Sequence, residues 1–427
     1  MPPLRQLNLR LYDTRRAGVL PLEPICDGPL GLYVCGITPY DTTHLGHAFT
    51  YLAFDVLHRY LEYLGHPVRY VQNLTDVDDD MLRHARDQGE DYLAMGRLHA
   101  DRFRADMAAL NWLAPDVYPR ATEHIPPMVA MIERLLAAGL AYRSDRYVFL
   151  SVAADPEYGS LAHVPVADRL ALANERGNDP DLPGKRDPLD PVLWQPSLPD
   201  EPAWPSPWGD GRPGWHIECS AMSVTHLGPR FEIHGGGRDL AFPHHESERT
   251  QSEGATGVRP VVRHWVHTGM VHYADEKMSK SVGNLVMIRD LLERWPVDAI
   301  RLALIRHHYR ADLTWTDQLA AQAQMTVQRW AQAAAVAPSA SSAPSAPSAP
   351  TVVADRIPVP EGVAALRESA LAALDDDLDT PRVVTTLDQL AELALASDQD
   401  PADREAAGTV LRDLATSILG LRLEPAA

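Results

Sequence analysis

Lysine is almost missing from this 427-residue chain. Of its 39 basic residues, 36 are arginine and only Lys185, Lys277 and Lys280 are lysine. Two of the three fall in one pentapeptide, KMSKS (277–281). Lysine carries a compact, strongly hydrated charge on a flexible stem, whereas the charge of arginine is planar and rigid. The pattern indicates that this pentapeptide needs mobile point charges, the alternative being that two lysines cluster by chance.

Cysteine is also scarce, and long apolar runs are missing. Cys26, Cys35 and Cys219 are too few and too scattered for a disulfide framework, which favours a reducing compartment. No apolar run approaches the ~20 residues of a membrane-spanning helix. The first residues, MPPLRQLNLRLYDTRR, carry charges where a secretory signal would be apolar. We therefore expect a soluble, cytoplasmic protein without a membrane partner, and we expect a monomer.

The composition excludes a disordered or fibrous protein. Hydrophobic residues make up 45% of the chain and charged residues 23%, which fits two or three folded domains. The net charge is −19, so general adhesion to nucleic acid or to an anionic membrane is disfavoured. Residues 355–427 hold 15 acidic residues, six arginines and no lysine. This tail is poorly equipped for the phosphate contacts that RNA binding requires.

The hydrophobic pattern predicts a parallel sheet. GLYVCG (31–36) is typical of a buried strand, residues 46–64 have apolar residues at helical spacing, and VRYVQNLT (68–75) predicts a second strand. Strand, helix and strand in this order form a βαβ unit. FEIHG predicts a later strand, followed by a glycine cluster and a helix from His244. Residues 290–309 predict two helices broken at Pro296.

Two short motifs carry phosphate chemistry. HLGH (44–47) lies between a predicted strand end and a helix start, where backbone N–H groups and imidazoles bind anions. The lysines of KMSKS would follow the charge that develops on a leaving pyrophosphate. Each motif alone has a plain alternative, a pair of surface histidines or an exposed basic turn. Together, in this order beside a parallel sheet, they resemble the class I aminoacyl-tRNA synthetase superfamily, which implies catalytic roles for His44, His47, Lys277 and Lys280.

A second group of residues suits a metal. Cys35 ends the first predicted strand, Cys219 lies in GWHIECSAM, and FPHHESE supplies His244 and Glu248, which share one face of a helix because they are four residues apart. Two thiolates, an imidazole and a carboxylate are ligands for Zn²⁺. The alternative is that both cysteines are ordinary buried small residues, a common fate of free cysteine. The residues alone leave both possibilities open.

Four longer motifs, YVCG, GWHIECSAM, HGGGRDLAFPHHESE and EKMSKSVGN, are similar to the cysteine-activating branch of that superfamily. The resemblance implies one zinc held by Cys35, Cys219, His244 and Glu248, with the substrate thiolate as a further ligand. Cysteine and serine differ by one atom, which an apolar pocket separates poorly, whereas soft zinc–thiolate bonding separates them directly. No editing domain is then needed, and we see no insertion that resembles one.

This branch has two kinds of member, which differ in the acceptor. Cysteinyl-tRNA synthetases transfer cysteine to tRNA, and mycothiol cysteine ligases transfer it to the amine of an amino-glucosyl-inositol. CGITPYD in place of CGPTVYD, ERGNDP (175–180), GNLV and LDTP (378–381) resemble the ligases, and from the last residues, ILGLRLEPAA, we expect no further anticodon-recognising region. Asn178, where the ligase motif has glycine, and the Pro/Ser/Ala stretch depart from the pattern. The resemblance favours the amino-sugar acceptor, with a shortened cysteinyl-tRNA synthetase as the alternative.

The ligase resemblance also implies an adenylate site. ATP, with Mg²⁺, would react with cysteine to form cysteinyl-adenylate, which the acceptor amine then attacks. Each residue has a plain structural alternative, such as core packing for Trp215 or a tight turn for the glycine run. The implied contacts are Cys35, Gly36, Ile37, Thr38, Thr50, Asn73, Leu74, Thr75, Trp215, Gly237, Arg238, Asp239 and Val271.

The expected fold is α/β, a doubly wound, Rossmann-like parallel sheet with a helical C-terminal domain. The nucleotide would bind at the carboxyl ends of the strands, near the point where the strand order reverses. We expect the TDVDDD run (75–80) to be a solvated turn. The predicted domains are a catalytic domain (1–310) with an inserted connective region (about 110–210), a helical extension (311–336), a Pro/Ser/Ala linker (337–354) and a helical domain (355–427).

Overall fold

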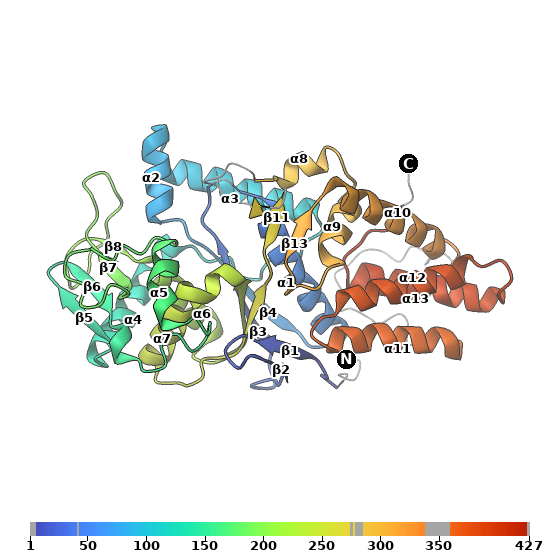
Figure 1. The fold of residues 1–427 in the computed structure, drawn as a ribbon, viewed down its shortest axis with the longest axis horizontal. Helices are drawn as coiled ribbons and strands as arrows, with labels where there is room; N and C mark the ends of the chain where they lie inside the picture. Colours follow the sequence, from blue (N-terminus) through green and yellow to red (C-terminus); the bar gives the residue numbers. More distant parts are fainter. Residues whose placement is uncertain (1–5, 41, 274–275, 278–284, 338–358, 425–427) are drawn as a thin grey trace.

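The computed structural model describes residues 6–40, 42–273, 276–277, 285–337 and 359–424. A parallel sheet occupies the middle of an elongated molecule (Figure 1). A lobe with a small antiparallel sheet lies at one end, and the C-terminal helices lie at the other. Within the described part of the chain, no helix combines the length and the apolar character needed to span a membrane.

The central sheet has four parallel strands in the order β10-β9-β3-β4. Its central strand β3 has seven of its eight residues buried, as expected for a strand that is covered on both faces. Leu32 of β3 lies between Ile233 of β9 and Tyr70 of β4. The bounds of the strands are Leu30–Ile37 for β3, Val68–Leu74 for β4, Phe231–Gly237 for β9 and Val262–Thr268 for β10.

The strand order reverses between β3 and β9. From β3 the chain passes through α1 (Leu45–Tyr63) to β4 on one side, and from β9 it passes through α7 (Glu246–Thr256) to β10 on the other. The carboxyl ends of β3 and β9 therefore flank a topological switch point, where α/β proteins bind their ligands. The predicted doubly wound fold is confirmed.

Helix α1 is the central helix of the molecule. Thirteen of its residues are buried, so it is apolar on most of its circumference rather than on one stripe. The pair of helices predicted around Pro296 is also present, as α8 (Ile288–Leu292) and α9 (Val297–Ile305). Pro296 is the N-cap residue of α9, where a missing N–H has no cost, and α8 ends four residues before it.

The chain between β4 and β9 forms the lobe that contains the antiparallel sheet β5-β6-β7-β8. Helices α4 and α6 pack against α7, which joins this lobe to the central sheet. Its elements are α2 (Asp79–Gln88), α3 (Tyr92–Ala109), α4 (Ile125–Ala137), β5 (Ala141–Ser144), β6 (Tyr147–Leu150), α5 (Val166–Asn174), β7 (Val192–Gln195), β8 (Arg212–Pro213) and α6 (Trp215–Leu227).

Two small sheets border the central one. The hairpin of β1 (Arg10–Asp13) and β2 (Gly18–Pro21) lies beside β10, where the Thr14 N–H donates to the Trp265 carbonyl over 2.9 Å. The other consists of β11 (Val271–Tyr273), β12 (Glu276–Lys277) and β13 (Leu313–Trp315). The second of these sheets lies at the carboxyl end of β10, because β11 begins three residues after β10 ends.

The C-terminal helices pack against the last turns of α1. The hydroxyl of Tyr60 donates to Asp375 over 2.7 Å, and that of Tyr63 donates to Asp413 over 2.8 Å. The predicted linker lies, apart from Ala337, outside the described residues. The helices are α10 (Asp317–Ala334), α11 (Glu361–Asp375), α12 (Thr380–Leu395) and α13 (Pro401–Ser417).

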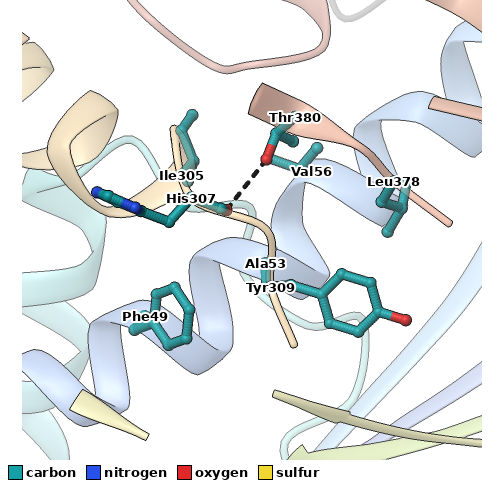
Figure 2. A pocket seen from close by; sticks show the side chains of 8 residues that line it. All are labelled: Phe49, Ala53, Val56, Ile305, His307, Tyr309, Leu378 and Thr380. Atoms are coloured by element: carbon teal, nitrogen blue, oxygen red, sulfur yellow. Dashed lines mark hydrogen bonds between the residues drawn. The ribbon is translucent and has the colours of Figure 1, made fainter. Parts of the chain in front are cut away.

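One small cavity lies between α1, the end of α9 and the segment that leads into α12. Figure 2 shows Val56 of α1 near Leu378, with the Thr380 hydroxyl donating to the His307 carbonyl over 3.2 Å. The cavity that remains among these side chains has about 10 Å³, room for at most one water molecule. This contact is part of the core and offers no space for a substrate.

Candidate active site and metal centre

His44 and His47 lie at the first turn of α1, beyond the carboxyl end of β3. His44 is the N-cap residue, and its Nδ1 accepts hydrogen bonds from the backbone N–H groups of Gly46 (3.1 Å) and His47 (3.4 Å). The two imidazole rings are stacked, with centroids 3.7 Å apart. A helix N-terminus carries a partial positive charge, so two imidazoles stacked there form a suitable site for a phosphate group.

The segment that follows KMSKS runs beside HLGH. The Leu45 N–H donates to the Val286 carbonyl, and the Ile288 N–H donates to the Thr43 carbonyl, both over 2.9 Å. At the start of KMSKS, the backbone of Lys277 in β12 pairs with His272 of β11. The Lys277 side chain and all of Lys280 lie outside the described residues. The fold thus brings the segment after KMSKS to the start of α1, although HLGH and KMSKS are far apart in the sequence.

The predicted adenylate contacts lie at adjacent strand ends. Cys35 to Ile37 end β3 and Thr38 follows, Asn73 and Leu74 end β4 with Thr75 after them, and Gly237 ends β9 with Arg238 and Asp239 after it. Thr50 lies on α1, with its hydroxyl 2.9 Å from that of Thr268 at the end of β10. Trp215 is the first residue of α6, and Val271 is the first of β11. These positions surround the switch point.

Gly36 occupies a position where a side chain cannot fit. A Cβ atom there would lie 1.6 Å from the carbonyl oxygen of Asn73. The close approach lets the Gly36 N–H donate to the Asn73 Oδ1 over 2.8 Å, while the Asn73 Nδ2 donates to the Thr75 hydroxyl over 3.1 Å. The ends of β3 and β4 are therefore fixed to each other by side-chain hydrogen bonds.

The four predicted metal ligands come together in one buried cluster. One ligand atom each of Cys35, Cys219, His244 and Glu248 lies within 4.8 Å of all the others, and all four residues are buried. His244 Nε2 is 3.1 Å from a Glu248 oxygen, and the Cys35 sulfur is 3.4 Å from the same oxygen. Ligands on a zinc tetrahedron are about 3.3–3.8 Å apart, given zinc–ligand distances of about 2.0–2.3 Å. The cluster is therefore compact enough for one ion.

Trp215 and His216 orient the His244 ring. The Trp215 ring stacks on it with centroids 4.3 Å apart, and His216 Nδ1 lies 2.8 Å from His244 Nδ1. A hydrogen bond to the second ring nitrogen of a ligating histidine fixes its tautomer and leaves the other nitrogen for the metal. Besides the ligand Cys219, α6 thus contributes two residues of its first turn that orient the His244 ring.

A second set of residues overlaps the first. Cys35, His234, His245 and Glu248 also bring four ligand atoms within 4.8 Å of one another. The Cys35 sulfur is 3.3 Å from His245 Nε2 and 3.5 Å from His234 Nε2. Because both sets use Cys35 and Glu248, one ion can take only one of them. The sequence prediction included neither His234 nor His245 as a ligand.

The electrostatics of the cluster suit a divalent cation. Burial raises the pKa of the Cys35 and Cys219 thiols and of the Glu248 carboxyl, and it lowers the pKa of the His244 imidazole. Buried anionic groups are costly without a counter-charge. A divalent cation would supply that charge and hold the thiols and the carboxyl deprotonated, next to an imidazole that is already neutral. The donor set therefore fits the predicted zinc.

A chain of histidines extends from this cluster, which sequence reasoning missed. His245 Nδ1 lies 2.8 Å from His267 Nε2, and His267 Nδ1 lies 2.7 Å from the Thr14 hydroxyl. His234, on β9, packs against the Trp265 ring with centroids 4.5 Å apart. The signal in the sequence is the two histidines of HWVHT (264–268), about 20 residues after the paired histidines of PHHE (243–246).

The comparisons with known proteins agree with this geometry. The family described as tRNA synthetases class I (C) catalytic domain matches residues 21–325. A relative from Thermomonospora curvata is 44% identical over 421 residues, which cover 98% of this chain and 95% of the relative. One from Saccharomonospora viridis is 45% identical and covers 97% and 96%. Both are named L-cysteine:1D-myo-inositol 2-amino-2-deoxy-alpha-D-glucopyranoside ligase. The chain belongs to this family of class I synthetase-like ligases. It is therefore an enzyme, a ligase.

Solved structures share the fold at much lower identity. The methionyl-tRNA synthetase of Mycobacterium tuberculosis in complex with methionyl-adenylate has a TM-score of 0.62 and 18% identity, covering 92% of this chain and 89% of that one. A putative arginyl-tRNA synthetase from Campylobacter jejuni has a TM-score of 0.56 and 12% identity, covering 93% and 94%. These neighbours establish the class I synthetase fold.

Proposed function

We propose that the protein activates L-cysteine with ATP and transfers it to the amine of 1D-myo-inositol 2-amino-2-deoxy-α-D-glucopyranoside, in the synthesis of mycothiol. The zinc ion would be held by Cys35, Cys219, His244 and Glu248. ATP, with Mg²⁺, would occupy the strand ends at the switch point. The names of the relatives support the acceptor, and the buried donor set supports the amino acid.

The observation that carries the proposal is the adjacency of Cys35 and Gly36. These consecutive residues end the central strand β3. Cys35 belongs to the cluster of metal-binding side chains, and Gly36 is fixed to Asn73 at the neighbouring strand end. A thiol-binding metal and a nucleotide-binding backbone would thus share one strand end. The formation of cysteinyl-adenylate requires this arrangement, because the two reactants must be held side by side.

Zinc bound in the cluster would coordinate the thiolate of the substrate and so distinguish cysteine from serine. The protein residues around it have a positioning role. His216 and Trp215 fix the His244 ring, and the His245–His267–Thr14 chain fixes the ring of His245 beside Cys35. A rigid, buried site holds the carboxylate of the bound cysteine toward the nucleotide.

In the first step, an oxygen of the cysteine carboxylate forms a bond to the α-phosphorus of ATP, and pyrophosphate leaves. His44 and His47 at the N-terminus of α1 would bind the departing phosphates, together with Lys277 and Lys280. Groups that bind charge developing in the transition state lower the barrier more than groups that bind substrate alone.

In the second step, the acceptor amine forms a bond to the carbonyl carbon of cysteinyl-adenylate. AMP leaves with the bonding electrons, and the proton of the amine passes to solvent. The adenylate is already a reactive mixed anhydride, so this step requires positioning above all.

Two assays test the proposal. Exchange of labelled pyrophosphate into ATP should depend on cysteine, should proceed without tRNA, and should fail with serine, the matched control. Purified enzyme given ATP, cysteine, glucosaminyl-inositol and total tRNA together should then form the amide as its main product. Exchange that strictly requires tRNA, or cysteinyl-tRNA as the main product, would instead identify a cysteinyl-tRNA synthetase.

A further inference from the structure

A cavity of about 530 Å³ lies on the β10 side of the switch point. Its size falls in the range of small-molecule sites, roughly 300–1,000 Å³. Five separate segments line it: the end of β1, the approach to α5 and α5 itself, the end of β9, the end of β10, and the turn before β13. Tyr12, His163, Arg176, Asp239, His267 and Arg310 represent these segments.

The cavity adjoins both reactants of the proposed function. His267 in its wall contacts His245, which in turn lies 3.3 Å from the Cys35 sulfur of the metal cluster. Asp239 in its wall is one of the predicted adenylate contacts, and it accepts no hydrogen bond from any residue in the described part of the chain. A ligand in this cavity would therefore sit next to the junction of the amino acid and the nucleotide.

The charges in the wall are balanced. Arg238 forms two hydrogen bonds to Asp312, of 2.8 and 2.9 Å, and Arg310 lies 2.6 Å from Asp377. Arg176 donates to the Phe242 carbonyl, and Asp239 lies in the same wall, so the three arginines and these three aspartates are equal in number. The wall thus offers many hydrogen-bond donors without a net positive field. Such a wall suits a ligand with many hydroxyl groups better than a polyanion, which requires uncompensated cations.

One sequence motif that the activation chemistry does not use lines this cavity, and a second one follows a residue that contacts its wall. Arg176 belongs to ERGNDP and lines it directly. The second motif, LDTP, begins directly after Asp377, a buried residue of the C-terminal region. Asp377 accepts hydrogen bonds from the Tyr12 N–H (2.8 Å) and from Arg310 Nε (2.7 Å). The Arg310 guanidinium in turn lies over the Tyr12 ring, 4.5 Å from its centroid.

We infer that this cavity binds the acceptor, a neutral, two-ring polyhydroxylated amine, with Asp377 as a positioning residue that holds Tyr12 and Arg310 in the wall. The inference rests on the proposed function, and it assigns the binding site of the second substrate, the acceptor, to this cavity. The amine would lie at the Asp239 and His267 end, beside the adenylate, and the hydroxyl groups would bind the arginines. The C-terminal region then shapes substrate binding, beyond its contribution to the core.

The first test fills the cavity. Leu172 of α5 lines it, whereas Val166, on the same helix, is 76% exposed and lies outside it. Leu172→Trp should raise the KM for glucosaminyl-inositol at least 10-fold and leave cysteine-dependent pyrophosphate exchange within twofold of the wild type. Val166→Trp should change neither. An unchanged KM in Leu172→Trp, or exchange that falls as much as transfer, would overturn the assignment.

The second test concerns the wall and remains informative if Leu172→Trp fails to fold. Arg310→Gln and Asp377→Asn should each raise the KM for glucosaminyl-inositol about 10-fold, with the KM values for ATP and cysteine within twofold of the wild type. A purely structural defect would lower kcat for every substrate together and would refute the positioning role. If wild-type enzyme shows no cysteine-dependent exchange, the proposed function fails, whatever these variants do.

Discussion

Asp55 of α1 and Arg301 of α9 form an ion pair from which solvent is fully excluded. The second oxygen of Asp55 accepts the Leu113 N–H over 2.7 Å, and Arg59 Nε donates to the carboxylate over 2.8 Å. Arg301 also donates to the carbonyl groups of Leu419 (2.5 Å) and Leu110 (3.0 Å). One pair thus joins the central helix, the helix after KMSKS and the end of the C-terminal region.

We expect Asp55→Asn to lower the free energy of unfolding by about 3–5 kcal/mol, because it leaves the Arg301 charge buried without a counter-charge. Chemical denaturation measures this. Asp80→Asn is the matched control, since Asp80 and its partner Arg83 are both exposed, and it should cost less than about 1 kcal/mol. Equal losses of unfolding free energy in the two variants would show that the buried pair stabilises the protein no more than the exposed pair.

The same pair predicts a pH dependence. Burial by itself raises the pKa of the Asp55 carboxyl, but the charges of Arg301 and Arg59 outweigh it and lower that pKa below its usual value. The stabilisation is therefore complete above the unfolded carboxyl pKa of about 4 and is lost as the pH falls through the lowered pKa of the folded state. The difference in stability between wild type and Asp55→Asn should shrink only in acid. A difference that is constant down to the acid transition would contradict this.

His44 is the N-cap of α1, and in the proposed function it is also a phosphate contact. Asparagine is a good N-cap and alanine is not, so His44→Ala should lower the free energy of unfolding by about 1 kcal/mol more than His44→Asn. Both variants should slow adenylate formation by about 10²-fold, because neither has the imidazole. Thermal unfolding and pyrophosphate exchange measure the two roles. Normal exchange by His44→Asn would show that His44 is only a cap.

The two overlapping metal sets can be distinguished by substitution. Cys219 belongs only to the predicted set, and His234 only to the other. After dialysis against a chelator and reconstitution with zinc, Cys219→Ser should retain much less than one zinc per chain, whereas His234→Asn should retain about one. Mass spectrometry of the metal content measures this. The reverse result would move the ion to the set with His234 and His245.

The lysines of KMSKS should act on the transition state. Lys280→Ala is expected to slow adenylate formation by about 10²-fold or more, with cysteine affinity nearly unchanged. Lys185→Ala is the control, since the third lysine donates to Asn178 over 2.6 Å and lies outside the motif. Rapid-quench measurement of adenylate gives the rate. Weaker cysteine binding at a normal activation rate would refute this role.

Local sequence patterns predicted the βαβ unit but not the burial of the residues that follow it. The spacing of apolar residues in 46–64 is a property of one helix, so the sequence alone indicates it. TDVDDD was expected to be a solvated turn, and this is wrong for Asp76, which is buried and accepts from the Thr122 N–H (2.9 Å) and hydroxyl (2.7 Å). Asp78 caps α2. The partners of Asp76 come from another segment, which no local pattern reveals.

The metal cluster shows the same division. His244 and Glu248 were predictable because they lie one helical turn apart. His234 and His267 reach the same region from the adjacent strands β9 and β10, so their proximity depends on the strand order. The contribution of Asp377 to the cavity wall likewise depends on how the C-terminal helices pack. The composition of residues 355–427 argues only against RNA binding, and the acceptor variants test whether this region also positions a substrate.

Helix α1 begins in the candidate active site and ends among the C-terminal helices, within one continuous hydrophobic core. The surface that joins residues 359–424 to the rest is therefore an interior surface, comparable to half of a domain core. We expect two separate polypeptides, residues 1–337 and 359–427, to associate and to reconstitute the active enzyme, as the halves of a split reporter do. The short fragment alone would expose its apolar face and aggregate. When the two fragments are co-expressed, cysteine-dependent activity would then report their association.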